Sequence, residues 1–276
     1  MNDTKPPLPT ANLEGLLQLM AQLRSPDGGC PWDIEQTFAT IAPHTIEEAY
    51  EVADAIDQGD MGHLKDELGD LLFQVVFYAQ MAKEQGAFNF HDIAGGITTK
   101  MINRHPHVFG DQTGIDSADA QTVNWEALKA EERKSKAETG RHGALDDVSR
   151  GFPALMRANK LQKRAARVGF DWPDAWPVFD KFREEVKELE AEIESGDQAA
   201  LEHEVGDLLF TCVNLARKLG VDPESALRHA NGRFESRFGH IEQSLWSEGR
   251  SVEGTDLAEL DRLWDEAKTI QKDDCD

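Results

Sequence analysis

One acidic pattern occurs twice in this chain, and the two copies keep the same spacing. Each copy has a Glu-Glu-x-x-Glu motif, and a Glu-x-Gly-Asp-Leu-Leu-Phe motif begins sixteen residues after the last glutamate of the first motif. Every matched carboxylate in the second copy lies 137 positions after its counterpart in the first. An internal repeat of this kind indicates two similar structural units built on the same plan.

Each copy is predicted to form a helical hairpin. Apolar residues recur at helical spacing on both sides of Gly59-Asp60 and of Gly196-Asp197, and short turns of this kind join antiparallel helices. Gly69 and Gly206 lie between the paired acids of the second helix in each hairpin. Because glycine lowers helix propensity, we interpret both as points where another helix approaches closely.

The correspondence continues beyond the hairpins, since Trp125 with Lys129 matches Trp264 with Lys268. The sequence therefore predicts an all-α fold with two tandem four-helix units built from antiparallel helical hairpins. We expect an N-terminal unit over residues 1–140, a linker with a basic helix over residues 141–170 and a C-terminal unit over residues 171–276.

Charge and hydropathy exclude several classes of function. The formal net charge of −23 argues against a nucleic-acid polymer as partner, because affinity for a phosphate backbone comes from clustered Lys and Arg. No apolar run reaches the roughly 20 residues that a membrane span needs. The N-terminus lacks the basic and apolar regions of a signal peptide, so we expect a cytoplasmic protein.

The paired acids are predicted to bind divalent cations. Residues three or four apart share a helix face, so Glu48 points with Glu51, and Glu67 points with Asp70. A hairpin can place the two pairs opposite each other, where four carboxylates repel unless cations neutralise them. Hard oxygen ligands with room for water suit Mg²⁺, with Mn²⁺ as the alternative.

The acids also admit other interpretations. Acidic helices are usually solvated, and Thr45 with Glu48 spells a capping box in which Glu48 would only satisfy a helix N-terminus. In the second copy, however, Phe182 replaces the threonine while Glu185 remains, with Asp180 as the candidate N-cap. An iron site of the ferritin type is disfavoured because the sequence has no Glu-x-x-His pair. We therefore favour the metal site.

Basic and aromatic residues of the second unit suggest a polyphosphate ligand. Lys181 lies one turn before Glu185, and Arg233 and Arg237 share a face of the third helix. Carboxylate-bound Mg²⁺ typically recruits substrate phosphates and orients a water for hydrolysis of a phosphoanhydride. Two further residues remain open in role: Trp264 either stacks on a base or packs in the core, and Asn231 either bonds the nucleotide or is a neutral surface residue.

The chain resembles the MazG family of tandem-domain nucleoside triphosphate pyrophosphohydrolases. Besides the two acidic motifs, the likeness rests on segments spread over most of the chain: Gly29-Cys30-Pro31-Trp32-Asp33, Ile41-Ala42-Pro43, Arg104-His105-Pro106-His107-Val108-Phe109 and Gly169-Phe170-Asp171-Trp172. The acidic motif alone would indicate only the wider group of all-α pyrophosphohydrolases.

The resemblance implies Mg²⁺-dependent cleavage of nucleoside and deoxynucleoside triphosphates, ATP included, to the monophosphate and pyrophosphate. It also implies broad base tolerance and a homodimer. The implied metal ligands are Glu185, Glu188, Glu204 and Asp207 in the second unit and Glu48, Glu51, Glu67 and Asp70 in the first. The implied nucleotide contacts are Lys181, Arg233, Arg237 and Trp264.

The two copies are not equivalent in their basic residues. His44 stands where the second copy has Lys181, so the first unit keeps its acids but has an altered polyphosphate clamp. We therefore predict that the second unit is the main catalytic site, with Glu184 or Glu185 positioning or deprotonating the attacking water. The competing hypothesis is a non-catalytic helical adaptor whose acidic hairpins bind cations or partner proteins.

Overall fold

The computed structural model describes residues 8–111, 143–146 and 148–273, together with residues 117, 118, 120, 121, 124 and 125. Within these residues the regular structure is helical and contains no strand, so the predicted all-α class is confirmed. The chain divides into two compact units, residues 1–136 and 137–276. No described helix combines the length and the hydropathy that crossing a membrane requires.

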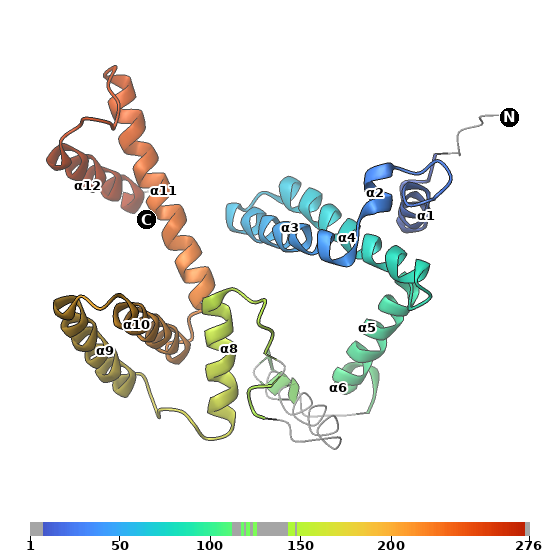
Figure 1. Ribbon diagram of the computed structural model, residues 1–276, viewed down its shortest axis with the longest axis horizontal. Coiled ribbons are helices and arrows are strands. Elements are labelled where there is room, and N and C mark those ends of the chain that lie inside the picture. Colours follow the sequence, from blue (N-terminus) through green and yellow to red (C-terminus); the bar gives the residue numbers. More distant parts are fainter. Residues whose placement is uncertain are drawn as a thin grey trace. The chain divides into compact units, whose positions relative to one another are not determined.

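Each unit contains a series of helices (Figure 1). The first unit has α1 (Leu13–Leu23), α2 (Pro31–Glu35), α3 (Phe38–Gln58), α4 (Met61–Glu84), α5 (Phe90–Arg104) and α6 (Pro106–Phe109). The second unit has α8 (Ala154–Arg167), α9 (Trp176–Ser195), α10 (Gln198–Lys218), α11 (Pro223–Ser247) and α12 (Leu257–Asp273). Helix α8 lies in the stretch predicted to be a linker with a basic helix.

The two predicted hairpins are α3 with α4 and α9 with α10, and their turns are the same. Gly59 and Gly196 end the first helices with φ 71° and ψ 15°, a left-handed conformation that glycine adopts at little cost. Asp60 and Asp197 then cap the second helices by accepting hydrogen bonds from two backbone N–H groups each. The repeat in sequence is therefore a repeat in backbone geometry.

The predicted N-caps at Thr45 and Asp180 are wrong, because both helices begin earlier. Helix α3 begins after Thr37, which forms the capping box with Thr40, and α9 begins at Trp176. The added turns of α3 bring Ile41 into the core with 2% of its surface exposed. The Thr45 hydroxyl lies 2.9 Å from the Tyr78 hydroxyl inside the hairpin. Glu48 is therefore a mid-helix residue, and the capping-box reading of it fails.

A closed apolar core holds the first unit together. Helix α1 packs across α4, and buried side chains from α1, α3 and α4 form one cluster: Met20, Ile41, Val76, Phe77 and Met81. Its walls are partly buried hydrophobic residues of the same helices and of α5. Burial of this kind stabilises by about 25 cal/mol per Å² of apolar surface, which fixes α1 against the hairpin.

In the second unit, α8 takes a similar place across α10. The Met156 backbone N–H donates to the Glu224 carboxylate of α11 over 3.2 Å, which satisfies a free donor at the N-terminus of α8. The Gln162 side-chain amide donates to the Phe210 carbonyl of α10 over 2.8 Å. Helices α11 and α12 pack on each other around Ile241 and neighbouring leucines (Figure 1).

The structure tests the expected close approach at the two glycines, but not the whole helix expected around Trp125. A Cβ atom added at Gly69 or Gly206 would meet no described atom within 4 Å. The prediction that another helix approaches these glycines closely is therefore wrong for the described helices of this chain. The helix expected around Trp125 and Lys129 falls mostly outside the described residues. Trp125 itself donates from its indole nitrogen to the Arg104 carbonyl over 3.3 Å.

Candidate metal and nucleotide site

Three carboxylates of the second unit converge across the α9–α10 hairpin. Glu185 and Glu188 lie one turn apart on α9, and Glu204 faces them from α10. One carboxylate oxygen from each lies within 4.8 Å of the others, and Glu185 is buried with 4% of its surface exposed. Desolvation, followed by the nearby carboxylates, raises the pKa of Glu188 against the opposing effect of Lys181. Such oxygen donors are the ligands that Mg²⁺ or Mn²⁺ prefers.

Lys181 is the cation of this cluster. Its ammonium group lies 2.7 Å from Glu184 and 2.8 Å from Glu185, one turn along the same helix. These hydrogen bonds, first to Glu184 and then to Glu185, raise the pKa of Lys181 above its usual value. The lysine therefore stays charged at neutral pH and compensates the buried Glu185 carboxylate.

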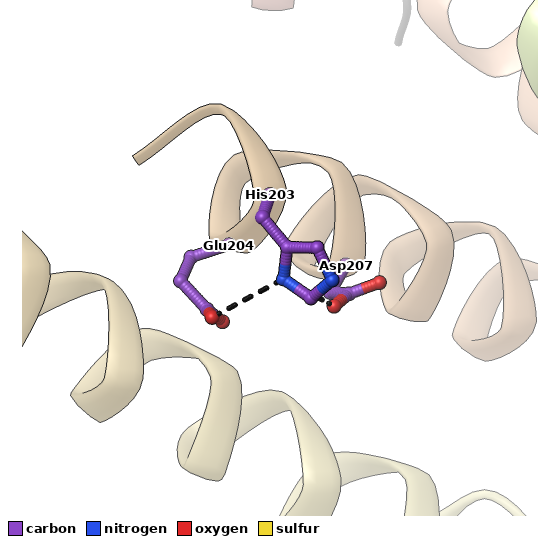
Figure 2. Close-up of side chains that lie close together, drawn as sticks. All are labelled: His203, Glu204 and Asp207. Carbon is purple, nitrogen blue, oxygen red and sulfur yellow. Dashed lines mark hydrogen bonds and ion pairs between the residues drawn. The ribbon is translucent and has the colours of Figure 1, made fainter. Parts of the chain in front are cut away.

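Asp207 and Glu204 share a histidine on the surface of α10. Figure 2 shows the His203 imidazole between the two carboxylates. Its Nδ1 atom lies 3.3 Å from an oxygen of each. The hydrogen bond with Glu204, followed by the charge of Asp207, raises the pKa of His203. These contacts satisfy the imidazole, and the same three side chains offer ligand atoms within 4.8 Å of one another. Asp207 is thus linked to Glu204, and so to the cluster, through His203.

The first unit has a similar group with different neighbours. Oxygens of Glu48, Glu51 and Glu67 lie within 4.8 Å of one another. The partner of Glu48 is the neutral amide of Gln74, which donates over 3.5 Å. Desolvation, and then repulsion from Asp70 and Glu51, raises the pKa of Glu48. Carboxylates that resist ionisation in this way would be stabilised by a cation.

The histidine that replaces the lysine in the first unit contacts a different acid. His44 lies 3.4 Å from Glu47, which is the counterpart of Glu184, and no ion pair to Glu48 is described for it. Glu48 of the first unit therefore has the uncharged amide of Gln74 as its donor, whereas Glu185 of the second unit has the Lys181 ammonium group. This difference separates two sites whose carboxylates otherwise correspond.

A cavity of about 510 Å³ adjoins the acidic cluster of the second unit. Lys181, Glu185 and Asp207 form one side of it, and α8, α10 and the segment before α9 form the rest. Small-molecule sites are usually concave, largely apolar and of this size, with a few polar groups. The carboxylates therefore lie at the edge of a space that can admit a ligand.

The other predicted nucleotide contacts lie on α11 and α12. Asn231 and Arg233 are exposed on α11, and the Arg237 guanidinium lies over the Trp264 ring at 5.5 Å from its centroid. Trp264 also packs against Phe234 and the buried cluster between the two helices. The structure therefore brings Lys181 to the carboxylates and places these four residues on a neighbouring helical pair.

Some residues around the cavity were not singled out from the sequence. Gln162 and Asn214 are buried there, with 6% and 5% of their surfaces exposed. Asn214 could have been noticed, because the repeat aligns it with Phe77 of the first unit. Gln162 lies in α8, outside the two matched acidic motifs, so the repeat offered no such signal.

Comparison with known proteins identifies the family. The model of the MazG nucleotide pyrophosphohydrolase domain matches residues 36–109 and 179–241, one region in each unit. A nucleoside triphosphate pyrophosphohydrolase of Escherichia coli (strain K12) is 52% identical over 95% of this chain and 98% of its own length. A nucleoside triphosphate pyrophosphohydrolase/pyrophosphatase of Thermotoga maritima is 45% identical over 92% of this chain and 95% of its own.

A third relative covers less of the molecule. The nucleoside triphosphate pyrophosphohydrolase of Mycolicibacterium smegmatis is 37% identical over 59% of this chain and 48% of its own length. The first two alignments span both helical units, and the family match falls on the same two hairpins that carry the carboxylates. This chain, with its repeated acidic hairpin, belongs to the MazG nucleotide pyrophosphohydrolase family.

Proposed function

We propose that this protein is a nucleoside triphosphate pyrophosphohydrolase whose main catalytic site is the acidic cluster of the second unit. Family membership and the near full-length similarity to enzymes of that name support the reaction, which yields the monophosphate and pyrophosphate. These comparisons favour an enzyme over a helical adaptor. The observation that carries the choice of unit is the Lys181 ammonium beside Glu184 and Glu185, which the first unit lacks.

The donor set fits a hard divalent cation. We assign Glu185, Glu188, Glu204 and Asp207 as the residues that would hold Mg²⁺ or Mn²⁺, because they offer only oxygen atoms from facing helices. When bound, such an ion offsets the charge of the phosphate oxygens and favours hydrolysis of the anhydride. The ligands in the first unit would be Glu48, Glu51, Glu67 and Asp70.

The chain's own residues account for binding and proton transfer. Lys181 exchanges its carboxylate partners for phosphate oxygens, and Arg233 and Arg237 add charge to the clamp. Glu184 is exposed beside Lys181, whereas Glu185 is buried within the cluster. Glu184 or Glu185 takes the proton of the attacking water. Trp264 and Asn231 complete the proposed nucleotide contacts.

We also propose that the protein is a cytoplasmic homodimer that binds no nucleic-acid polymer. The net charge of −23 supports the exclusion of nucleic acid. Gly69 and Gly206 of the acidic helices support the dimer, because a Cβ atom at either would meet no described atom of the chain within 4 Å. A second copy could approach the helices closely at these positions.

Matched alanine variants of the two units test the assignment of the site. Glu185→Ala is expected to lower the rate of pyrophosphate release from ATP with Mg²⁺ by at least about 100-fold, since it removes a buried ligand next to Lys181. Glu48→Ala is expected to lower the rate by less than about threefold. The readout is the initial rate, with products separated by anion-exchange chromatography.

The identity of the products tests the proposed reaction, and the relative loss of rate in the two variants tests the assignment to the second unit. Diphosphate plus phosphate as products, or no turnover by the unaltered protein, would refute the proposed reaction. A larger loss from Glu48→Ala than from Glu185→Ala would refute the assignment to the second unit. The helical signal in circular dichroism, measured for both variants, excludes unfolding as the cause.

A further inference from the structure

The cavity beside the second acidic cluster has the walls of a site for a planar ring. Three aromatic residues line it, namely Phe170 and Trp172 from the segment before α9 and Phe210 from α10. Phe170 is 80% exposed and Trp172 is 39% exposed, although both are large aromatic side chains next to a cavity. Aromatic rings in this setting offer stacking surfaces to a flat ligand.

At the corresponding position, the first unit has a buried core side chain. Phe77 of α4, the counterpart of Asn214, is 1% exposed and belongs to the closed core that α1 completes. Asn214 is also buried, yet it lines the cavity between α8 and α10. Exchange of a large apolar ring for a small amide at this position thus accompanies the change from a packed core to an open pocket.

The oxygen of one buried amide in the pocket lacks a hydrogen-bond partner among the described residues. The Oε1 atom of Gln162 is inaccessible to solvent and has no hydrogen-bond partner among the described residues, while its amide nitrogen donates to the Phe210 carbonyl. An unsatisfied buried acceptor costs about 1–3 kcal/mol, so a ligand that donates to it once the Gln162 side chain turns toward the cavity gains affinity. Every common nucleobase carries at least one N–H donor at its edge.

The aromatic segment is tied to α10 by charged contacts. Asp171 lies between Phe170 and Trp172 and accepts hydrogen bonds from Arg217 at 2.5 Å and from Lys218 at 2.8 Å. The Lys218 ammonium also bonds the Trp172 carbonyl. Both aromatic residues are therefore held on the cavity, although neither is buried in a core.

We infer that this cavity binds the nucleobase of the triphosphate substrate, with Phe170, Trp172 and Phe210 stacking on the ring and Gln162 and Asn214 bonding its edge. The inference rests on the proposed function, because Lys181 and the carboxylates at the rim would hold the triphosphate of the same molecule. The base enters between α8 and α10. A pocket that relies on stacking and on donors common to all bases accepts several bases.

Filling the pocket as the first unit does is the main test. All proteins carry Glu48→Ala, so that the second unit supplies the turnover, and hydrolysis of ATP with Mg²⁺ is measured together with inhibition by magnesium tripolyphosphate, which has no base. Asn214→Phe is expected to raise the KM for ATP about tenfold or more, the range lost when one stacked base is removed. The inhibition constant of tripolyphosphate is expected to stay within twofold.

A second variant tests the pocket without changing a buried side chain, so its effect does not depend on whether Asn214→Phe folds. Phe170→Ala removes a side chain that is 80% exposed and is expected to raise the KM for ATP by about five- to tenfold without altering tripolyphosphate inhibition. The matched control is Trp246→Ala, since Trp246 is an aromatic residue on α11 that is 61% exposed and does not line the cavity. Its kinetic constants are expected to equal those of the parent.

The outcomes separate this inference from the proposed function. Unchanged KM values for ATP in both variants, or equal weakening of ATP and tripolyphosphate, would overturn the base pocket while leaving the enzyme in place. A parent protein that releases no pyrophosphate from ATP would overturn the proposed function, and the base pocket with it. Selective loss of ATP affinity supports the inference.

Discussion

At the scale of single residues, the charge balance around Glu185 distinguishes the two acidic clusters. Glu185 is buried and lies 2.8 Å from the Lys181 ammonium, whereas its counterpart Glu48 has the amide of Gln74 at 3.5 Å. A cation positioned among carboxylates can move to an incoming phosphate without leaving its helix. In the proposed function, the carboxylates that Lys181 releases would then be available to a metal ion.

Removal of this one charge is predicted to weaken catalysis. Lys181→Met keeps the aliphatic stem but loses the ammonium group, and we expect kcat/KM for ATP to fall about 10- to 100-fold. The physical reason is the loss of a charge-assisted hydrogen bond, worth about 1.5–3 kcal/mol. The measurement is pyrophosphate release at subsaturating ATP. Lys187→Met, on an exposed position of the same helix, is the control and is expected to behave as the unaltered protein. Equal kcat/KM values for both variants would show that Lys181 does not bind the polyphosphate.

At the scale of elements, the segment before α9 depends on one carboxylate. The hydrogen bond from Arg217, with a further one from Lys218, lowers the pKa of Asp171 from 3.8 to about 2. A pKa that is lower in the folded state than in the unfolded state means that folding favours the ionised form. The resulting stability is complete above the unfolded value and disappears as the pH falls toward about 2.

This linkage predicts a pH-dependent effect of Asp171→Asn. At pH 7 the variant is expected to lose about 1–2 kcal/mol of unfolding free energy, a range that allows for solvent screening at a partly exposed group. The loss is expected to shrink as the pH falls below about 4. Urea unfolding followed by tryptophan fluorescence at pH 7, 5 and 3 measures it. Asp174→Asn, an exposed neighbour, serves as the control, and a pH-independent loss for Asp171→Asn would contradict the linkage.

At the scale of the whole molecule, both units expose the same apolar face. Leu68 and Leu72 of α4 are 49% and 40% exposed, and their counterparts Val205 and Leu209 of α10 are 43% and 52% exposed. A Cβ atom added at the adjacent Gly69 or Gly206 would meet no atom of the described residues within 4 Å. Open apolar faces beside small residues are common where chains associate. They support the proposed homodimer.

A charge on this face is predicted to break the dimer. We expect the unaltered protein to sediment as a dimer and Leu209→Glu to shift it toward the monomer at micromolar concentration, because a carboxylate in an apolar contact must be desolvated. Analytical ultracentrifugation gives the mass. Leu8→Glu, at a position 94% exposed near the N-terminus, is the control that should remain dimeric. A monomeric unaltered protein would refute the proposal.

Much of the fold followed from the printed sequence. The hairpins, their glycine turns and the pairing of acids were predicted because helical periodicity and turn residues act locally. The helix starts at Thr45 and Asp180 were wrong, since burial of Ile41 and the capping box at Thr37 extend α3 toward the N-terminus. Tertiary packing thus decided where the helices begin, against a plausible local signal.

The sequence by itself determined the all-α class, the repeated unit and the acidic clusters, because residues three or four apart on one helix share a face whatever surrounds them. Only the tertiary structure decided that α8 crosses α10 and leaves a cavity beside Asn214, whereas the first unit buries Phe77 in its core at that position. That difference depends on the volumes of side chains distant in sequence, such as Gln162 and Asn214. Spacing along the chain carries no information about how such volumes add up in space.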